Sequence, residues 1–403
     1  MGLEYRVPET QTAVITTAEG GHKASHDRAV PKCGPKSVLV RVRAVALNPT
    51  DHKTPARVKT AGLTAGCDFA GEVEEVGSEA NEEPGACEIP RRWTTGDRVF
   101  GVVYGSNPGA RDWGAFAEFV EADPVMLCHM PASWDFETAA SVGGSVHGSV
   151  ALCLFGKGNM GLDMTRLQQM TNATIDKDSV DISPFEQDGR VRKEYLKKVV
   201  LVYGGSTTCG TMALQILRLA GYVPIATCSP GNAELAKSYG AVHTFDYHSA
   251  TCADSIKRYT WSALPQALDC ISNAQSAQIC YGALGRTGGA YVALEKYPES
   301  IASTRRVVRP SWVMGPVMFG RELTLGEGYS QPADPEARAF ARVWYPLAEA
   351  LVGSGSLRRH PTSTVEQPEG SGGRGWPEAV IRGLEDLRRG NVSARKLVVA
   401  VSS

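Results

Sequence analysis

The stretch from Lys198 to Gln215 constrains the fold of this chain more than any other. An apolar strand, Val199 to Val202, runs into the turn Tyr203-Gly204-Gly205-Ser206 and then into an amphipathic helix. This order places backbone N–H groups and a helix N-terminus where they can bind a pyrophosphate, and so predicts a dinucleotide site. Thr207 and Thr208 stand where a G-x-G-x-x-G motif has glycine, so a tight turn in an unrelated α/β protein is the alternative.

The segment after the next apolar run favours one nicotinamide cofactor. A second strand at 222–227 completes a βαβ unit, and NAD-binding units carry an Asp or Glu near the end of this strand for the ribose 2′-OH. Here Ser229, Asn232 and Lys237 occupy the region, and their donors and positive charge suit a 2′-phosphate. We therefore expect NADPH. An ordinary helix-capping turn is the alternative for Ser229 and Asn232.

The remaining pattern predicts two domains in an α/β chain. Further apolar runs at 242–245, 266–270 and 290–294 extend the βα pattern into an open parallel sheet. Residues 1–140 instead contain short strands separated by glycine and proline, at 12–16, 38–46, 69–76, 98–103 and 115–120. A last strand at 396–401 follows helical segments at 337–352 and 376–389, so we expect the end of the chain to return to the first domain.

Composition and charge exclude several classes of partner. The net charge is −1, so no overall field attracts nucleic acid or a membrane surface. We find neither a signal peptide nor an apolar run near the roughly 18 residues that span a membrane, and we expect a cytoplasmic protein. The ten cysteines include no C-x-x-C pair, which fits a reducing compartment and gives no structural zinc site.

Several motifs together resemble the zinc-independent medium-chain dehydrogenase/reductases. They are Ala46–Asp51, Gly66–Gly71, Gly96–Val99, Gly114–Glu118 and the glycine turn. A narrower resemblance is to the stand-alone, trans-acting enoyl reductases of fungal polyketide pathways, and it is carried by Val202–Thr207, Ile225–Pro230, Leu268–Ile271 and Gly315–Gly320. Zinc-dependent members carry Gly-His-Glu where this chain has Gly66-Cys67-Asp68, so we expect no metal. A site of Cys67 with His52 or His147 is the less favoured alternative.

The resemblance implies a fold and a reaction. The fold is a GroES-like β-rich catalytic domain, residues 1–145 with 321–403, plus a Rossmann doubly wound parallel sheet at 146–320 with a polar insertion at about 157–197. The reaction is NADPH-dependent reduction of an α,β-unsaturated acyl thioester on the carrier domain of a polyketide synthase or PKS-NRPS, by a monomer. A stand-alone NADPH-dependent quinone or enone reductase, and a non-catalytic NADPH-binding accessory protein, are the alternatives.

The resemblance also implies the site residues. Lys53 is the candidate catalytic residue, and ribose positioning alone is its alternative role. The cofactor residues are Thr50, Asp51, His52, Lys53, Ser206, Thr207, Thr208, Cys209, Ser229, Pro230, Gly231, Asn232, Tyr247, Leu294, Glu295, Ser393 and Ala394. The substrate residues, mostly small, are Gly144, Ser145, Val146, His147, Gly148, Ser149, Val150, Ala151, Gly315, Pro316, Val317, Met318 and Phe319.

Two surface features are candidates for contact with a carrier domain. The insertion at 157–197 is polar and is either a docking element or a loop without function. Arg305, Arg306 and Arg309 precede the pocket segment at 315–319 and are either a binding patch for an acidic carrier domain or a solvated basic turn.

Overall fold

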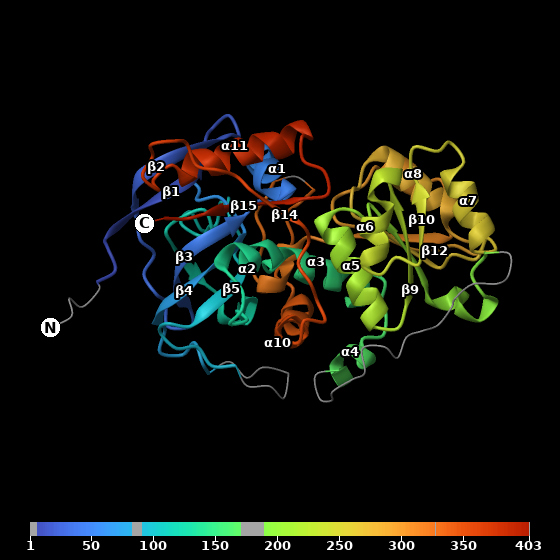
Figure 1. Ribbon diagram of the computed structural model, residues 1–403, viewed down its shortest axis with the longest axis horizontal. Coiled ribbons are helices and arrows are strands. Elements are labelled where there is room, and N and C mark those ends of the chain that lie inside the picture. Colours follow the sequence, from blue (N-terminus) through green and yellow to red (C-terminus); the bar gives the residue numbers. More distant parts are fainter. Residues whose placement is uncertain (1–5, 83–90, 171–188, 327, 403) are drawn as a thin grey trace. The chain divides into compact units, whose positions relative to one another are not determined.

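The computed structural model describes residues 6–82, 91–170, 189–326 and 328–402, and the chain divides into two compact units. Unit 1 comprises Met1–Ser145, Pro316–Gly353 and Arg359–Ser403, and unit 2 comprises Val146–Gly315 and Ser354–Arg358. The sequence places the divisions after residues 145 and 320, and the two units meet after Ser145 and after Gly315. Figure 1 shows the elements of both units.

Unit 1 is built on β-sheets. A seven-stranded sheet has the order β14-β15-β3-β4-β5-β7, with β6 also paired to β3, and β1 and β2 form a separate antiparallel ribbon. The strands are β1 (Thr10–Thr16), β2 (His22–Ala29), β3 (Val38–Ala46), β4 (Asp68–Val76), β5 (Arg98–Val102), β6 (Phe119–Ala122), β7 (Leu127–His129), β14 (Thr362–Thr364) and β15 (Lys396–Ala400). The final strand β15 pairs antiparallel with β3, so the end of the chain returns to this unit.

The helices of unit 1 cover its sheets. They are α1 (Pro49–Val58), α2 (Phe136–Val142), α10 (Pro335–Gly353) and α11 (Trp376–Arg389), with the 3₁₀ turn η1 (Pro124–Met126). Apolar side chains alternate along β3 and β4 and meet one face of α11, whose Trp376, Val380 and Leu384 are buried in the same core. Figure 1 shows α11, in red, beside β1 and β2. The helix ends at Gly390, which has φ 73°.

Unit 2 is a parallel six-stranded sheet in the order β10-β9-β8-β11-β12-β13. The elements are α4 (Thr165–Met170), η2 (Lys193–Lys198), β8 (Val199–Tyr203), α5 (Thr208–Leu219), β9 (Val223–Cys228), η3 (Pro230–Asn232), α6 (Ala233–Ser238), β10 (His243–Asp246), α7 (Cys252–Tyr259), β11 (Gln266–Asp269), α8 (Ala274–Ala283), β12 (Gly289–Ala293), α9 (Glu299–Ala302) and β13 (Val308–Trp312). Two further elements, α3 (Ser145–Phe155) and η4 (Gly315–Phe319), start where one unit passes into the other. Counted in chain order, the strands run 3-2-1-4-5-6, the doubly wound order of dinucleotide-binding sheets. In Figure 1 α5 and α6 lie on one side of this sheet and α7 on the other.

One sequence expectation about apolar runs is wrong. Residues 136–155 form a 20-residue stretch that is long and apolar enough, by length and composition, to cross a membrane. The structure divides it into α2 and α3 at Gly143 and Gly144, and 83% of the apolar window is buried inside the protein. Buried core helices share this composition, so the stretch is weak evidence for a membrane segment.

The polar insertion expected at 157–197 is only partly visible. Residues 171–188, which include most of the charged segment, lie outside the described part of the chain. The described flanks belong to unit 2, because Leu167 of α4 is fully buried and Val191 lies in the hydrophobic core. The backbone N–H of Val191 also donates to the carbonyl of Tyr259, at 3.2 Å. These flanks therefore bury more than the sequence suggested.

Candidate active site

The glycine turn after β8 lies at the carboxyl edge of the parallel sheet. β8 and β11 are neighbours in the sheet; β9 and β10 continue it on the β8 side, and β12 and β13 continue it on the β11 side. Doubly wound sheets bind ligands at the carboxyl edge, at the point where the strand order reverses in this way. A Cβ added to Gly210 would lie 2.1 Å from the carbonyl oxygen of Gly204, so only glycine lets helix α5 approach the strand this closely. Gly210 therefore allows the close packing of helix on strand that the last glycine of a G-x-G-x-x-G motif allows.

The side chain of Thr207 stabilises the turn by two hydrogen bonds. Its hydroxyl donates to the carbonyl of Gly204 at 2.8 Å and accepts from the N–H of Gly210 at 2.9 Å, which makes Thr207 the N-cap of α5. Ser206, Thr207, Thr208 and Cys209 are all half-buried. The first-turn N–H groups of the 12-residue helix therefore stand at an edge where a phosphate can be bound.

The loop after β9 holds the residues expected at a 2′-phosphate. Ser229 and Asn232 are hydrogen-bonded to each other, Asn232 Nδ2 to Ser229 Oγ, at 3.0 Å, and Pro230 and Gly231 are exposed. The ammonium of Lys237, by contrast, lies 2.9 Å from a carboxylate oxygen of Glu234. Both side chains are well exposed, so this ion pair is weak. The two opposite charges largely cancel, so Lys237 adds little net positive charge to the loop.

The other predicted cofactor residues of unit 2 follow the ends of β10 and β12. Tyr247 lies beside Tyr203, with 6.0 Å between ring centroids, and Leu294 donates its N–H to the carbonyl of Asp269 at 3.1 Å. Glu295 follows Leu294 and is half-buried. These residues follow strands that lie on both sides of β8. Because the strands are parallel, their carboxyl ends all lie at one edge of the sheet.

Sequence analysis missed two residues at this edge. The buried carboxylate of Asp269 accepts from the N–H groups of Ile271 and Ser272 and from the hydroxyls of Ser276 and Tyr291, at 2.6–2.9 Å, so it organises the turn after β11. Burial raises its pKa. Ile271 is a large apolar side chain that is 38% exposed and lies against Gly204, a position suited to packing on a ligand. Its contact with Gly204 is not visible in a linear sequence.

In unit 1 the predicted segment Thr50 to Lys53 forms the first turn of α1. Asn48 and Asp51 make a capping box, in which the carboxylate of Asp51 accepts from the N–H of Asn48 at 2.7 Å. Burial, and then the nearby charge of Asp68, raise the pKa of Asp51 to about 7 against the hydrogen bond from Asn48. Oδ1 of Asp51 is buried and has no hydrogen-bond partner among the described residues. The thiol of Cys67 lies close to this carboxyl and affects its pKa, so the start of α1 is a polar environment.

A buried ion pair and its hydrogen bonds join four segments of unit 1, and we call Asn48, Asp68, Ser145 and Lys396 the Asp68 cluster. Lys396 Nζ lies 3.3 Å from Asp68 Oδ2 and donates to Asn48 Oδ1, and Asn48 Nδ2 donates to Asp68 at 2.9 Å. The N–H groups of Gly144 and Ser145 and the Ser145 hydroxyl complete the shell at 2.6–3.0 Å. The cluster therefore ties the start of α1 to β4, β15 and the segment after α2.

The cluster also places the other predicted residues of unit 1. Ser393 and Ala394 lie three and two residues before Lys396, whose ammonium donates to Asn48 at the N-terminus of α1. Lys53 is exposed on α1, and burial together with the charge of Lys53 lowers the pKa of the adjacent His52. Residues 50–53 and 393–394 thus belong to unit 1, whereas the remaining cofactor residues belong to unit 2.

Cys67 stands between Asp51 and Asp68 in an acidic surrounding. Burial, Asp51 and Asp68 all raise the pKa of its thiol well above the ordinary value, so it stays protonated. Within the ranges that the structure describes, no group of three or more His, Cys, Asp or Glu side chains is placed to hold a metal ion.

Most of the predicted substrate residues are buried, and the rest are half-buried. From Gly144 to Ala151 only Ser145 and Ser149 are half-buried, and the others are packed inside. A Cβ on Gly315 would lie 2.5 Å from Ser149 Oγ, so two predicted residues of unit 2 are in contact. Of the segment 316–319, Met318 and Phe319 are buried and Phe319 packs edge-on against Trp113, with 4.8 Å between centroids.

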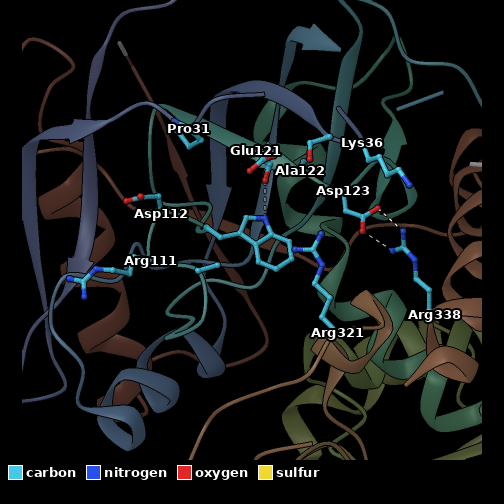
Figure 2. Close-up of a pocket in the computed structure, with 12 residues that line it drawn as sticks. Pro31, Lys36, Arg111, Asp112, Glu121, Ala122, Asp123, Arg321 and Arg338 are labelled. Carbon is cyan, nitrogen blue, oxygen red and sulfur yellow. Dashed lines mark hydrogen bonds and ion pairs between the residues drawn. The ribbon is translucent and has the colours of Figure 1, made fainter. Parts of the chain in front are cut away.

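A cavity of about 330 Å³ opens in unit 1, and none of the predicted site residues lines it. Figure 2 shows one charge pair in its lining, in which Arg338 binds both oxygens of Asp123, at 2.7 and 3.1 Å. Asp112, also in the lining, pairs with Arg28, and Arg321 lies over the ring of Trp113 at 5.2 Å. The predicted substrate residue Phe319 therefore borders the cavity only through its contact with Trp113.

Comparisons with known proteins connect this geometry to a family. Residues 34–132 match the alcohol dehydrogenase GroES-like domain. The chain is 64% identical over 403 residues, all of both chains, to the trans-enoyl reductase ucsL of Acremonium sp, and 39% identical to the trans-enoyl reductase mycC of Thermothelomyces thermophilus, again over both full lengths. The fold matches the crystal structure of the CurK enoyl reductase with a TM-score of 0.66 at 17% identity, over 97% of this chain and all of that one.

Proposed function

Because the chain belongs to the trans-enoyl reductases, within the zinc-independent medium-chain dehydrogenase/reductases, we propose that it uses NADPH to reduce an α,β-unsaturated acyl thioester. It is an oxidoreductase that acts on a carbon–carbon double bond of a polyketide and works in trans. The observation that carries this conclusion is the 64% identity over the whole chain. The thioester, NADPH and the residue roles below go further than that identity.

The residues of unit 2 fit a nicotinamide dinucleotide. Only a glycine permits the turn at Gly210, and the N–H groups that begin α5 suit a pyrophosphate. The choice of NADPH is supported by the absence of Asp and Glu from 223–232 and by the donors Ser229 and Asn232. The ammonium of Lys237 is a further donor, although it is paired with Glu234. When bound, the nicotinamide supplies a hydride.

The residues of unit 1 suit orientation and charge stabilisation. The Asp68 cluster holds the first turn of α1, and with it the exposed Lys53, in one place. Negative charge grows on the thioester oxygen as the β-carbon accepts hydride, so a fixed cation such as Lys53 stabilises that state or holds the ribose. Solvent is the simplest source of the proton that the α-carbon then takes up.

We further propose that the substrate is presented by the carrier domain of a partner polyketide synthase or PKS-NRPS in the cytoplasm, and that the enzyme is a monomer. The edge strand β13 supports the monomer, because Arg309 and Pro310 are both exposed on it and proline donates no hydrogen bond to a neighbouring strand. Arg305 is excluded from a docking patch, since its guanidinium donates to the carbonyls of Tyr281, Leu284 and Gly285 at the end of α8.

The test is oxidation of NADPH or NADH by the purified protein with crotonyl-pantetheine or with a simple quinone. We expect turnover of the thioester with NADPH and much slower turnover with NADH. Turnover of the quinone alone would replace the proposal with a stand-alone reductase. Tight NADPH binding without reduction of either acceptor, even when the carrier-bound substrate is supplied, would identify an accessory protein.

A further inference from the structure

Tyr104 carries a buried hydroxyl that no part of the described chain satisfies. The side chain is 4% exposed, and its oxygen has no hydrogen-bond partner among the described residues of the protein. Ser106, two positions later, is 2% exposed, and its hydroxyl is unsatisfied in the same way. Buried polar groups are rarely left without a partner, because desolvation without a hydrogen bond costs on the order of 1–3 kcal/mol.

The backbone around Tyr104 is held rigidly. The N–H of Val103 donates to the carbonyl of Cys67 at 3.0 Å, and the N–H of Ser106 donates to the carbonyl of Thr64 at 2.7 Å. A Cβ on Gly105 would lie 2.1 Å from the carbonyl oxygen of Gly66, so the two loops are in backbone contact. Ser106 itself has φ 56°, a conformation that costs energy in a residue with a side chain. Rigid support for an unsatisfied donor is typical of functional sites.

The electrostatic surroundings keep this hydroxyl protonated and face it with positive charge. Burial, followed by the effect of Cys67, raises the pKa of Tyr104, and the positive charge of Arg57 opposes this shift. Arg57 lies four residues after Lys53 on α1, so the two cations share one face of the helix. Cys67 lies within reach of Asp51 as well as of Tyr104. Tyr104 is therefore part of the same polar environment as the first turn of α1.

We propose that the hydroxyl of Tyr104 is the hydrogen-bond donor for the thioester oxygen of the substrate, an inference that rests on the proposed function. The hydride forms a bond to the β-carbon, the π electrons of the double bond shift to the α-carbon and carbonyl, and the thioester oxygen becomes an enolate oxygen. The Tyr104 hydroxyl donates to this oxygen and keeps its proton. The α-carbon then takes a proton from solvent, and the carbonyl is restored.

The experiment compares Tyr104→Phe with the wild type in two assays. Oxidation of NADPH with crotonyl-pantetheine gives kcat and KM, and thermal unfolding with and without the saturated product butyryl-pantetheine gives stability and binding. We expect kcat to fall about 100-fold, as when one oxyanion donor is removed. The unfolding midpoint without ligand stays the same or rises, because an unsatisfied buried group has been removed, while the stabilisation by butyryl-pantetheine shrinks.

Tyr281→Phe is a matched control. Tyr281 is 3% exposed in the core of unit 2, and its hydroxyl likewise has no hydrogen-bond partner among the described residues. Tyr281→Phe also removes an unsatisfied buried hydroxyl, but it should leave kcat and the response to butyryl-pantetheine unchanged.

Each outcome decides a different question. If Tyr104→Phe keeps more than half of the wild-type kcat, or lowers the unfolding midpoint while losing activity, the donor role is wrong. If Tyr281→Phe loses as much kcat as Tyr104→Phe, the effect is general and the inference fails. A wild-type protein that never oxidises NADPH with the thioester would instead overturn the proposed function, and the response of its stability to butyryl-pantetheine would still test the contact with Tyr104.

Discussion

Lys396→Met should destabilise unit 1 far more than the loss of a surface charge would. Lys396 is 3% exposed and Asp68 is fully buried, so removal of the ammonium leaves a buried carboxylate without its cation. Breaking a buried pair from one side costs about 3–5 kcal/mol. Asp68 keeps its donors from Asn48, Gly144 and Ser145, which places the expected loss near the lower end, at about 3 kcal/mol.

The assay is urea unfolding followed by tryptophan fluorescence, since Trp93 and Trp376 lie in the core of unit 1. The control is Arg43→Met, which removes the cation of a 2.7 Å pair with Glu72 in which each side chain is about one third exposed. That change should cost under about 1 kcal/mol. If Lys396→Met costs no more than Arg43→Met, then water reaches the Asp68 cluster and the argument from burial is refuted.

Three further perturbations follow from the described contacts. Gly210→Ala should weaken NADPH binding more than about tenfold in a fluorescence titration, because the added Cβ would strike a carbonyl of the turn. Gly353→Ala is the control, because the space around Gly353 is open and binding should not change. Equal affinities of the two variants would contradict the close approach of α5 to the turn. The wild type should lose stability relative to Asp51→Asn as pH rises from 4 to 7, by at most about 1.4 kcal/mol per pH unit. In this range the carboxyl of Asp51 is protonated in the folded protein, where its pKa is about 7, but ionised in the unfolded chain. A difference in urea unfolding that does not change with pH would contradict this. Arg305→Ala should cost about 2 kcal/mol in the unfolding of unit 2 while Arg306→Ala costs almost nothing, and equal costs would show that the carbonyl contacts are unimportant.

The parallel sheet was largely predictable from sequence, because strands buried on both faces are continuous apolar runs. The segment expected at 199–202 is β8, and those expected at 242–245 and 290–294 correspond closely to β10 and β12. The edge strand β13 was missed, since its sequence, VRPSW, has no apolar run and only Val308 in it is buried. The ribbon strand β2 was missed for the same reason: its sequence, HKASHDRA, has no apolar alternation.

The helical nature of the segment from Gly144 to Ala151 was also missed. Its small residues suggested space for a substrate, whereas eleven residues from Ser145 form α3, in which Val146, His147 and Val150 are buried. A helix that is buried on most sides lacks the periodicity that predicts amphipathic helices. The predicted contact of this segment with substrate remains a prediction.

The two candidate sites differ in how far a sequence can anticipate them. The glycine turn at 203–210 is local, so its residue order already indicates strand, turn and helix. The ion pair of Asp68 with Lys396 joins residues 328 positions apart, and no local pattern indicates it. Tyr104 could not be predicted either, because the lack of a hydrogen-bond partner is a property of the folded neighbourhood.

The position of β15 has a consequence for synthesis on the ribosome. This strand lies between β14 and β3, so the sheet of unit 1 lacks an interior strand until residues 396–400 have left the exit tunnel. Unit 2, made almost entirely of the continuous segment 146–315, has all six of its strands much earlier. Domains generally fold as they emerge, so the nascent chain would carry a folded unit 2 while the edge of β3 still awaits its partner. During that interval the exposed edge is a target for chaperones and a risk for aggregation.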